Sequence, residues 1–166
     1  ELPSLRVDSR SDTGVYDAIN QGVALARGAW VIVLGGDDRL HADDTLARAA
    51  PVLAHSVADM VYGDVYMMSD GNGVRAGARY AGPMTLEDLL SKNICQQSIF
   101  YRRSLFTSLG AFDLRYRIWA DWDFNLRVAF RRPFAWIDLV VADYAAARGV
   151  TIGLEEENRE FLAALK

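Results

Sequence analysis

Hydrophobic and polar residues alternate along this chain in two kinds of pattern. Apolar runs rich in β-branched and aromatic residues predict strands that are buried on both faces. These runs lie at 30–35, 58–69, 96–103 and 134–144. Between them apolar residues recur at helical spacing, most clearly in the segment that begins at Gly14 and has Gly28 as a stop. Alternating strands and helices predict an α/β fold, with a mostly parallel central sheet flanked by helices.

The remaining pattern completes this outline. Further helices are predicted at 42–56, 85–93, 103–110, 121–131 and 154–166. A hairpin turn at 70–73 should join the strand 58–69 to a partner at 74–80, and Leu5–Val7 has the pattern of a short strand. Thr85 is a candidate helix cap, as are Asp12 and Thr13 for the first helix.

Length and charge limit the possible functions. The chain has 166 residues, which suits a single domain over 1–166. A net charge of -4 argues against nucleic-acid binding, which needs a basic face. The single cysteine, Cys95, excludes an internal disulfide and favours a reducing compartment, so we expect a cytoplasmic protein. The chain starts without Met and close to the middle of an element, so we expect an N-terminally truncated fragment.

The end of the strand at 30–35 carries the first chemical signal. Gly35 and Gly36 allow a sharp turn and the close approach of a ligand, and Asp37 and Asp38 follow directly. In α/β sheets ligands bind beyond the carboxyl ends of central strands, where we expect these residues to lie. Adjacent carboxylates suit Mg²⁺ shared with substrate phosphates, although they could instead cap the next helix. The acids at 43–44 can also provide that cap, and the residues alone leave both roles open.

These residues belong to a longer pattern. The stretch "SDTGVYDAINQGVALARGAWVIVLGGDD" at 11–38 resembles the nucleotide-sugar-binding half of inverting glycosyltransferases of family 2, which have the GT-A fold. The segments "VYGDV", "QQSIFYRRSLFTSLGAFD" and "YRIWADWDFNLR" follow in the same family's order and spacing, at 61–65, 96–113 and 116–127. The resemblance covers most of the chain and implies a GT-A fold.

The resemblance implies a role for each matched position. It makes Asp38 the ligand of a divalent cation, Mn²⁺ or Mg²⁺, on the donor diphosphate, and Asp37 its partner nearer the ribose or the metal's water shell. It makes Asp121 the catalytic base. Asp12 resembles an acid close to the nucleotide. Further substrate-binding positions implied by the resemblance are Tyr16, Asn20 and Arg148.

Several of these positions have a simpler alternative. Asp121 could be only the N-cap of a helix that begins at Trp122. Tyr16 could only pack on its helix face, and Arg148 could be a solvated loop charge. The chemistry nevertheless fits the resemblance, because an inverting transfer needs a base for the acceptor hydroxyl and a positive charge on the departing diphosphate.

The chain also departs from the family's pattern. The apolar strand with which the family opens is absent, and Cys95 stands where many relatives have His. In the turn at 147–151, "ARGVT", the family's usual Gly-Gly pair reads Arg148-Gly149.

The resemblance implies transfer of a sugar from a nucleotide donor, expected to be a UDP-sugar, to a saccharide or lipid-linked acceptor. We expect a role in making a bacterial polysaccharide or glycolipid, with peripheral association at the inner face of the membrane. The alternatives are a non-catalytic nucleotide-sugar or carbohydrate-binding module, and another metal-phosphate enzyme such as a nucleotidyltransferase.

Overall fold

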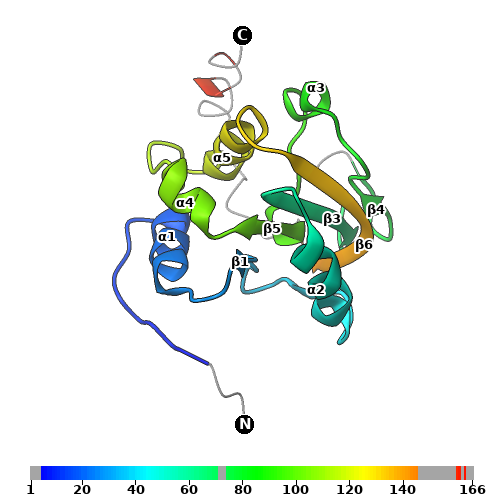
Figure 1. Cartoon of the computed structure of the whole chain (residues 1–166), viewed down its shortest axis with the longest axis horizontal. Coiled ribbons are helices and arrows are strands. Elements are labelled where there is room, and N and C mark those ends of the chain that lie inside the picture. The colour runs from blue at the N-terminus through cyan, green and yellow to red at the C-terminus, as the bar shows by residue number, and fades with distance from the viewer. Residues whose placement is uncertain (1–4, 71–73, 146–159, 162, 164–166) are drawn as a thin grey trace.

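The computed structural model describes residues 5–70, 74–145, 160–161 and 163 (Figure 1). The helices are α1 (Val15–Leu25), α2 (Thr45–His55), α3 (Leu86–Leu89), α4 (Ser104–Ser108) and α5 (Ala120–Ala129), with a 3-10 turn η1 (Gln96–Ser98). The strands are β1 (Trp30–Val31), β2 (Arg39–Leu40), β3 (Met60–Met67), β4 (Arg79–Tyr80), β5 (Ile99–Arg102) and β6 (Phe134–Tyr144). Helices and strands alternate as predicted, so the α/β class is confirmed.

The sheet is mixed and not mostly parallel, which corrects the prediction. Its order is β1-β5-β3-β6-β2, with β4 added to β3. Of the described strand pairs only β3 and β6 run parallel, and the other four are antiparallel. The prediction failed because continuous apolar runs report burial on both faces, and helices on both faces bury antiparallel strands equally well.

The strand predicted at 30–35 is shorter than expected and lies elsewhere. β1 covers only Trp30 and Val31, and within the described chain it pairs with β5 alone, at the edge of the sheet. Leu34 is 38% exposed. The prediction of a central strand is therefore wrong for the described chain, because Val33 and Leu34 leave the sheet to line a pocket. Leu5–Val7 forms no strand and is exposed.

Two apolar clusters cover the two faces of the sheet. Met60 and Tyr62 of β3 point to one face, where they pack with α1, α4 and α5. Val61 points to the other face and packs with Ala49 and Leu53 of α2. This alternation is the period-two pattern of a strand, and it fixes α1 and α5 on the same face.

The predicted helix caps, turn and C-terminal helix can be compared with the structure. The Thr85–Asp88 capping box of α3 is present, and Pro51 lies inside α2. The N-cap of α1 is Gly14, so the prediction of an Asp12 or Thr13 cap is wrong. The turn residues 71–73 and most of the C-terminal helix predicted at 154–166 lie outside the described residues. In the part of the chain that the structure describes, no helix has the length and apolar character needed to span a membrane.

Candidate active site

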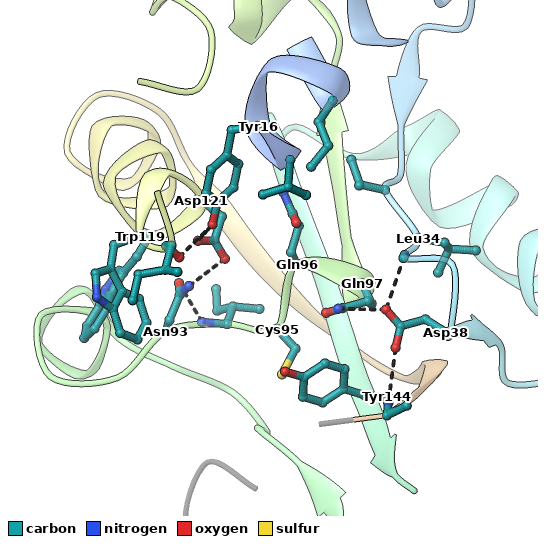
Figure 2. Close-up of a pocket in the computed structure, with 18 of the residues that line it drawn as sticks. Tyr16, Leu34, Asp38, Asn93, Cys95, Gln96, Gln97, Trp119, Asp121 and Tyr144 are labelled. Atoms are coloured by element: carbon teal, nitrogen blue, oxygen red, sulfur yellow. Dashed lines mark hydrogen bonds between the residues drawn. The ribbon is translucent and has the colours of Figure 1, made fainter. Parts of the chain in front are cut away.

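One pocket of about 750 Å³ gathers most of the predicted site residues (Figure 2). Its walls come from α1, the loop after β1, the segment around η1, the start of α5 and the end of β6. Four of the predicted site residues line it: Tyr16, Asp37, Asp38 and Asp121. Figure 2 shows Asp38 and Asp121 on opposite sides of the pocket, with Gln96 between them.

Three hydrogen bonds hold the Asp38 carboxylate at one side of this pocket. Its Oδ2 accepts from Nε2 of Gln97 at 2.9 Å and from the main-chain N–H of Gly35 at 3.3 Å. Its Oδ1 accepts from the main-chain N–H of Ala145 at 3.2 Å, just after β6. Asp38 thus joins three separate parts of the chain, and its position depends on the sheet as well as on its own loop.

The surroundings of Asp38 fit a hard divalent cation. A Cβ atom built on Gly35 would lie 2.7 Å from Oδ2 of Asp38 and 3.3 Å from Oδ1 of Asp37, so both carboxylates turn toward the bare side of this glycine. Carboxylate oxygens are suitable ligands for Mg²⁺ and Mn²⁺. Among the described residues no group of three or more His, Cys, Asp or Glu could hold a metal. A cation here would therefore need ligands from its substrate, as Mg²⁺ commonly does with phosphates.

Asp121 lies on the other side of the pocket, in the first turn of α5. The N-cap of α5 is Trp119, so the alternative that Asp121 is the cap is wrong. The Asp121 carboxylate is half-buried, and it accepts at Oδ1 from the Tyr16 hydroxyl at 2.7 Å and at Oδ2 from Nδ2 of Asn93 at 3.0 Å. The carboxylate therefore faces the pocket and the side chains around it, and does not close the helix.

Burial raises the pKa of the Asp121 carboxyl above its usual value. The hydrogen bonds from Tyr16, from the main chain and from Asn93 act in the opposite direction without cancelling the effect of burial. A carboxylate with a raised pKa is a stronger base than an ordinary aspartate, which is a property expected of a group that removes a proton.

A chain of buried polar groups fixes the partner of Asp121. Asn93 accepts at Oδ1 from Nδ2 of Asn125 at 2.9 Å and from the N–H of Ile94 at 3.0 Å, which leaves its Nδ2 directed at Asp121. The Oδ1 of Asn125 accepts in turn from the hydroxyl of Tyr101 at 2.7 Å. Two donors on Oδ1 decide which end of the Asn93 amide faces Asp121.

Asn20 and Asp12, which the structure describes, do not line this pocket. Asn20 binds the main chain of Phe112 at both ends of its amide, at 2.9 and 3.0 Å, and so ties α1 to the segment before α5. Asp12 is exposed and accepts from the N–H of Gly14. Arg148 lies outside the described residues. Substrate binding by these three residues stays a prediction.

The two tryptophans near Asp121 have different environments. Trp122 is 5% exposed and donates its Nε1 to the main-chain oxygen of Leu89, so it belongs to the core even though it also borders the pocket. Trp119 is half-buried and lines the pocket. An aromatic face at this position can pack against a sugar ring or another flat group.

Sequence reasoning missed several polar side chains of the pocket. Asn93 and Gln97 hold the two carboxylates, and neither was predicted. Lys92, Gln96 and Arg117 also line the pocket. The available signal was the three amide side chains within 93–97, directly before an apolar strand that starts in the core. The contacts with Asp38 and Asp121 join positions far apart in the sequence, and local patterns do not report such contacts.

The fold is that of a GT-A-like α/β domain. The model of glycosyl transferase family 2 matches residues 2–110, and the chain belongs to this family.

Two curated relatives come from mycobacteria. A "PGL/p-HBAD biosynthesis glycosyltransferase" of Mycobacterium bovis is 46% identical over 160 residues, covering 93% of this chain and 59% of the relative. An uncharacterized glycosyltransferase of Mycobacterium tuberculosis is 31% identical over 125 residues, covering 73% of this chain and 46% of the relative. The chain thus spans about half the length of these relatives.

Solved structures of S. aureus TarS share the fold. TarS 1-349 superposes with a TM-score of 0.66 at 17% identity, over 92% of this chain and 44% of TarS. The TarS complex with UDP-GlcNAc gives a TM-score of 0.64 at 16% identity, over 83% of this chain and 40% of TarS.

Proposed function

We propose that the protein transfers a sugar, with inversion, from a nucleotide-diphosphate donor to an acceptor hydroxyl. One observation carries this proposal: Asp38 and Asp121, each held by its own set of hydrogen bonds, line one pocket from opposite sides. An inverting displacement needs the base and the leaving group at opposite ends of the reacting bond. A single pocket with two separated carboxylates supports that arrangement.

On the Asp38 side, we assign the site to the donor diphosphate and a cation. Asp38 and Asp37 would hold Mn²⁺ or Mg²⁺, which neutralises the charge on the departing diphosphate. The protein itself contributes orientation, because Gln97, Gly35 and Ala145 fix the Asp38 carboxylate before any ligand arrives. A group held in advance need not reorganise during the reaction.

On the opposite side, we assign Asp121 the removal of the acceptor proton. The Asp121 carboxylate takes the proton while the acceptor oxygen forms its bond to the anomeric carbon and the bond to the diphosphate oxygen breaks. Tyr16 donates to Oδ1 and Asn93 donates to Oδ2, and the acceptor hydroxyl would approach the carboxylate from the pocket. The raised pKa of Asp121 supports this role.

The comparisons support a choice of donor and acceptor class. TarS structures contain UDP-GlcNAc and UDP, and we propose a UDP-sugar donor here. Relatives named for PGL/p-HBAD biosynthesis support a saccharide or lipid-linked acceptor. Trp119, on the Asp121 side, offers an apolar face for such an acceptor. For a lipid-linked acceptor we propose peripheral association of the full-length protein with the membrane.

A non-catalytic binding module explains the pocket less well. Binding a nucleotide sugar requires the Asp38 side alone, whereas Asp121 is a carboxylate whose charge is disfavoured by burial. A binding module has no use for such a group in the same pocket. Its presence favours a transferase.

A donor screen tests the proposal directly. The full-length protein should be incubated with a panel of UDP-, GDP- and dTDP-sugars, with Mn²⁺ or with EDTA, and nucleotide release measured with and without saccharide and lipid-linked acceptors. We expect one donor class to release its diphosphate in a Mn²⁺-dependent and acceptor-stimulated manner. Tight donor binding without release under any condition would instead support the binding module.

A further inference from the structure

We propose that the Tyr16 hydroxyl is a positioning group that follows the protonation of Asp121. It donates to the carboxylate while Asp121 is ionised, and it turns to the main-chain oxygen of Ile118 once Asp121 has accepted a proton. The proposal rests on the proposed function, in which Asp121 is the base. It replaces the sequence-based expectation that Tyr16 binds substrate.

The geometry around the Tyr16 hydroxyl offers two acceptors for one proton. Its oxygen lies 2.7 Å from Oδ1 of Asp121 and 2.7 Å from the main-chain oxygen of Ile118. A phenol has one proton to donate and can also accept. A main-chain oxygen can only accept, so the Tyr16 proton must point to one of the two oxygens at a time. Tyr16 is 8% exposed, and its ring packs against Phe112, so the hydroxyl stays at this position.

In this arrangement Asp121 has a hydrogen bond with Tyr16 in both of its protonation states. With Asp121 ionised, Tyr16 donates to Oδ1. With Asp121 protonated at Oδ1, the acid donates to the Tyr16 oxygen and Tyr16 donates to Ile118. The only proton transferred is the one that moves from the acceptor hydroxyl to Asp121. The Tyr16 hydroxyl keeps its proton. Burial and the nearby Asp121 raise the pKa of Tyr16 far above its usual value, so it stays neutral throughout.

The second oxygen of Asp121 cannot serve in the same way. Asn93 presents Nδ2 to Oδ2, and the donors Ile94 and Asn125 on its Oδ1 prevent the amide from turning over. An amide nitrogen is a donor only, so it cannot accept from a protonated Oδ2. Tyr16 is therefore the hydrogen-bonding side chain of Asp121 that suits both states.

The other titratable groups near Asp121 do not replace Tyr16. Tyr101 of β5 lies close enough to interact electrostatically with Asp121, but its hydroxyl donates to Asn125. Asp123, on the same helix as Asp121, pairs with Arg127 at 2.8 Å. Lys92 and Arg117 also line the pocket, and both are cations that can only donate, so neither can accept a hydrogen bond from protonated Asp121 as the Tyr16 hydroxyl can.

Carboxylate titration of the full-length protein tests the proposal without any substrate. Asp residues are labelled with ¹³C at the carboxyl carbon, and the Asp121 signal is assigned by its loss in Asp121→Asn. In Tyr16→Phe we expect the Asp121 midpoint to rise by about one pH unit, a tenfold change in its acid dissociation constant. Tyr62→Phe is the control, because it also removes a buried phenol oxygen, one that accepts from the N–H of Met84 away from Asp121. An unchanged or lower midpoint in folded Tyr16→Phe overturns the proposal.

A wild-type measurement covers the case in which Tyr16→Phe does not fold. The ¹³Cζ signal of Tyr16 should change with the same midpoint as Asp121, since the hydroxyl changes its partner, and this change should vanish in Asp121→Asn. A Tyr16 signal that stays constant through the Asp121 titration contradicts the proposal.

Kinetics separate this proposal from the proposed function. If Asp121→Asn transfers sugar normally, Asp121 is not the base and the proposed function fails. If Asp121→Asn is inactive while Tyr16→Phe raises KM for the donor with an unshifted pH profile, only the present proposal fails. We expect Tyr16→Phe to lower kcat at acidic pH, to recover at higher pH, and to leave the donor KM nearly unchanged.

Discussion

Gln97 donates a hydrogen bond of 2.9 Å from its Nε2 to Oδ2 of Asp38, and so fastens the loop after β1 to the segment that leads into β5. The carboxylate proposed to bind the metal is therefore held by η1, directly before β5. A change at Asp38 should act on ligand binding more than on folding, because the residue is half-buried in a loop.

Asp38→Ala should abolish the Mn²⁺-dependent part of UDP binding in the full-length protein. It removes one of very few protein ligands and leaves the diphosphate charge unshielded. Calorimetric titration of UDP with and without Mn²⁺ measures this. Asp44→Ala is the matched control, since Asp44 is exposed and its side chain makes no capping hydrogen bond. Unchanged Mn²⁺-dependent binding in Asp38→Ala would refute the metal role.

Gly35→Ala should weaken the same binding without lowering Tm. The added Cβ would meet Oδ2 of Asp38 at 2.7 Å, so the flexible carboxylate must move away from its place. Gly36→Ala is the control next to it, because nothing lies within 4 Å of a Cβ there. We expect a clear loss of Mn²⁺-dependent affinity for Gly35→Ala and wild-type affinity for Gly36→Ala. Equal affinities for the two variants would mean that the Asp38 carboxylate need not stay where it is.

The rate of transfer should fall at acidic pH with a midpoint above the ordinary aspartate value. Burial raises the pKa of Asp121, and a base works only when it is deprotonated, so activity is lost as the pH drops through this raised pKa. The same shift acts on stability, since the folded state holds this proton more tightly than the unfolded state does. The stabilisation is complete below the unfolded pKa and is lost as the pH rises through the folded pKa. A profile of kcat against pH that stays flat down to pH 4 would contradict the assignment of Asp121.

The sequence predicts the elements of this fold better than their arrangement. The strand at 134–144 and the helix cap at Thr85 depend on local patterns, and both appear as predicted. The apolar run after Trp30 was misplaced, because an apolar residue that lines a pocket and one that fills a sheet look the same in one dimension. Pairing direction depends on connections between distant strands, and hydrophobic pattern does not encode it.

In the candidate site too, the sequence predicted residues that belong to local patterns but missed contacts between distant positions. Asp37, Asp38 and Asp121 were predicted from the family pattern, and all three line the pocket. Asn93 was not predicted, because its role depends on a 3.0 Å contact with a helix that comes 28 positions later. Tyr16 was predicted in the site with a different role, since the sequence could not indicate that its hydroxyl binds Asp121.

The most direct test of the central claim is sugar transfer by Asp121→Asn in the full-length protein. Asn keeps the shape of Asp, and its amide can donate to the Tyr16 oxygen while its carbonyl accepts from Asn93, so folding and donor affinity should stay close to wild type. Only the basicity is removed, and transfer should fall by on the order of 10²–10⁴-fold. Normal transfer, with unchanged Tm and donor affinity, would show that the base lies elsewhere, with Asp123 as the first residue to examine.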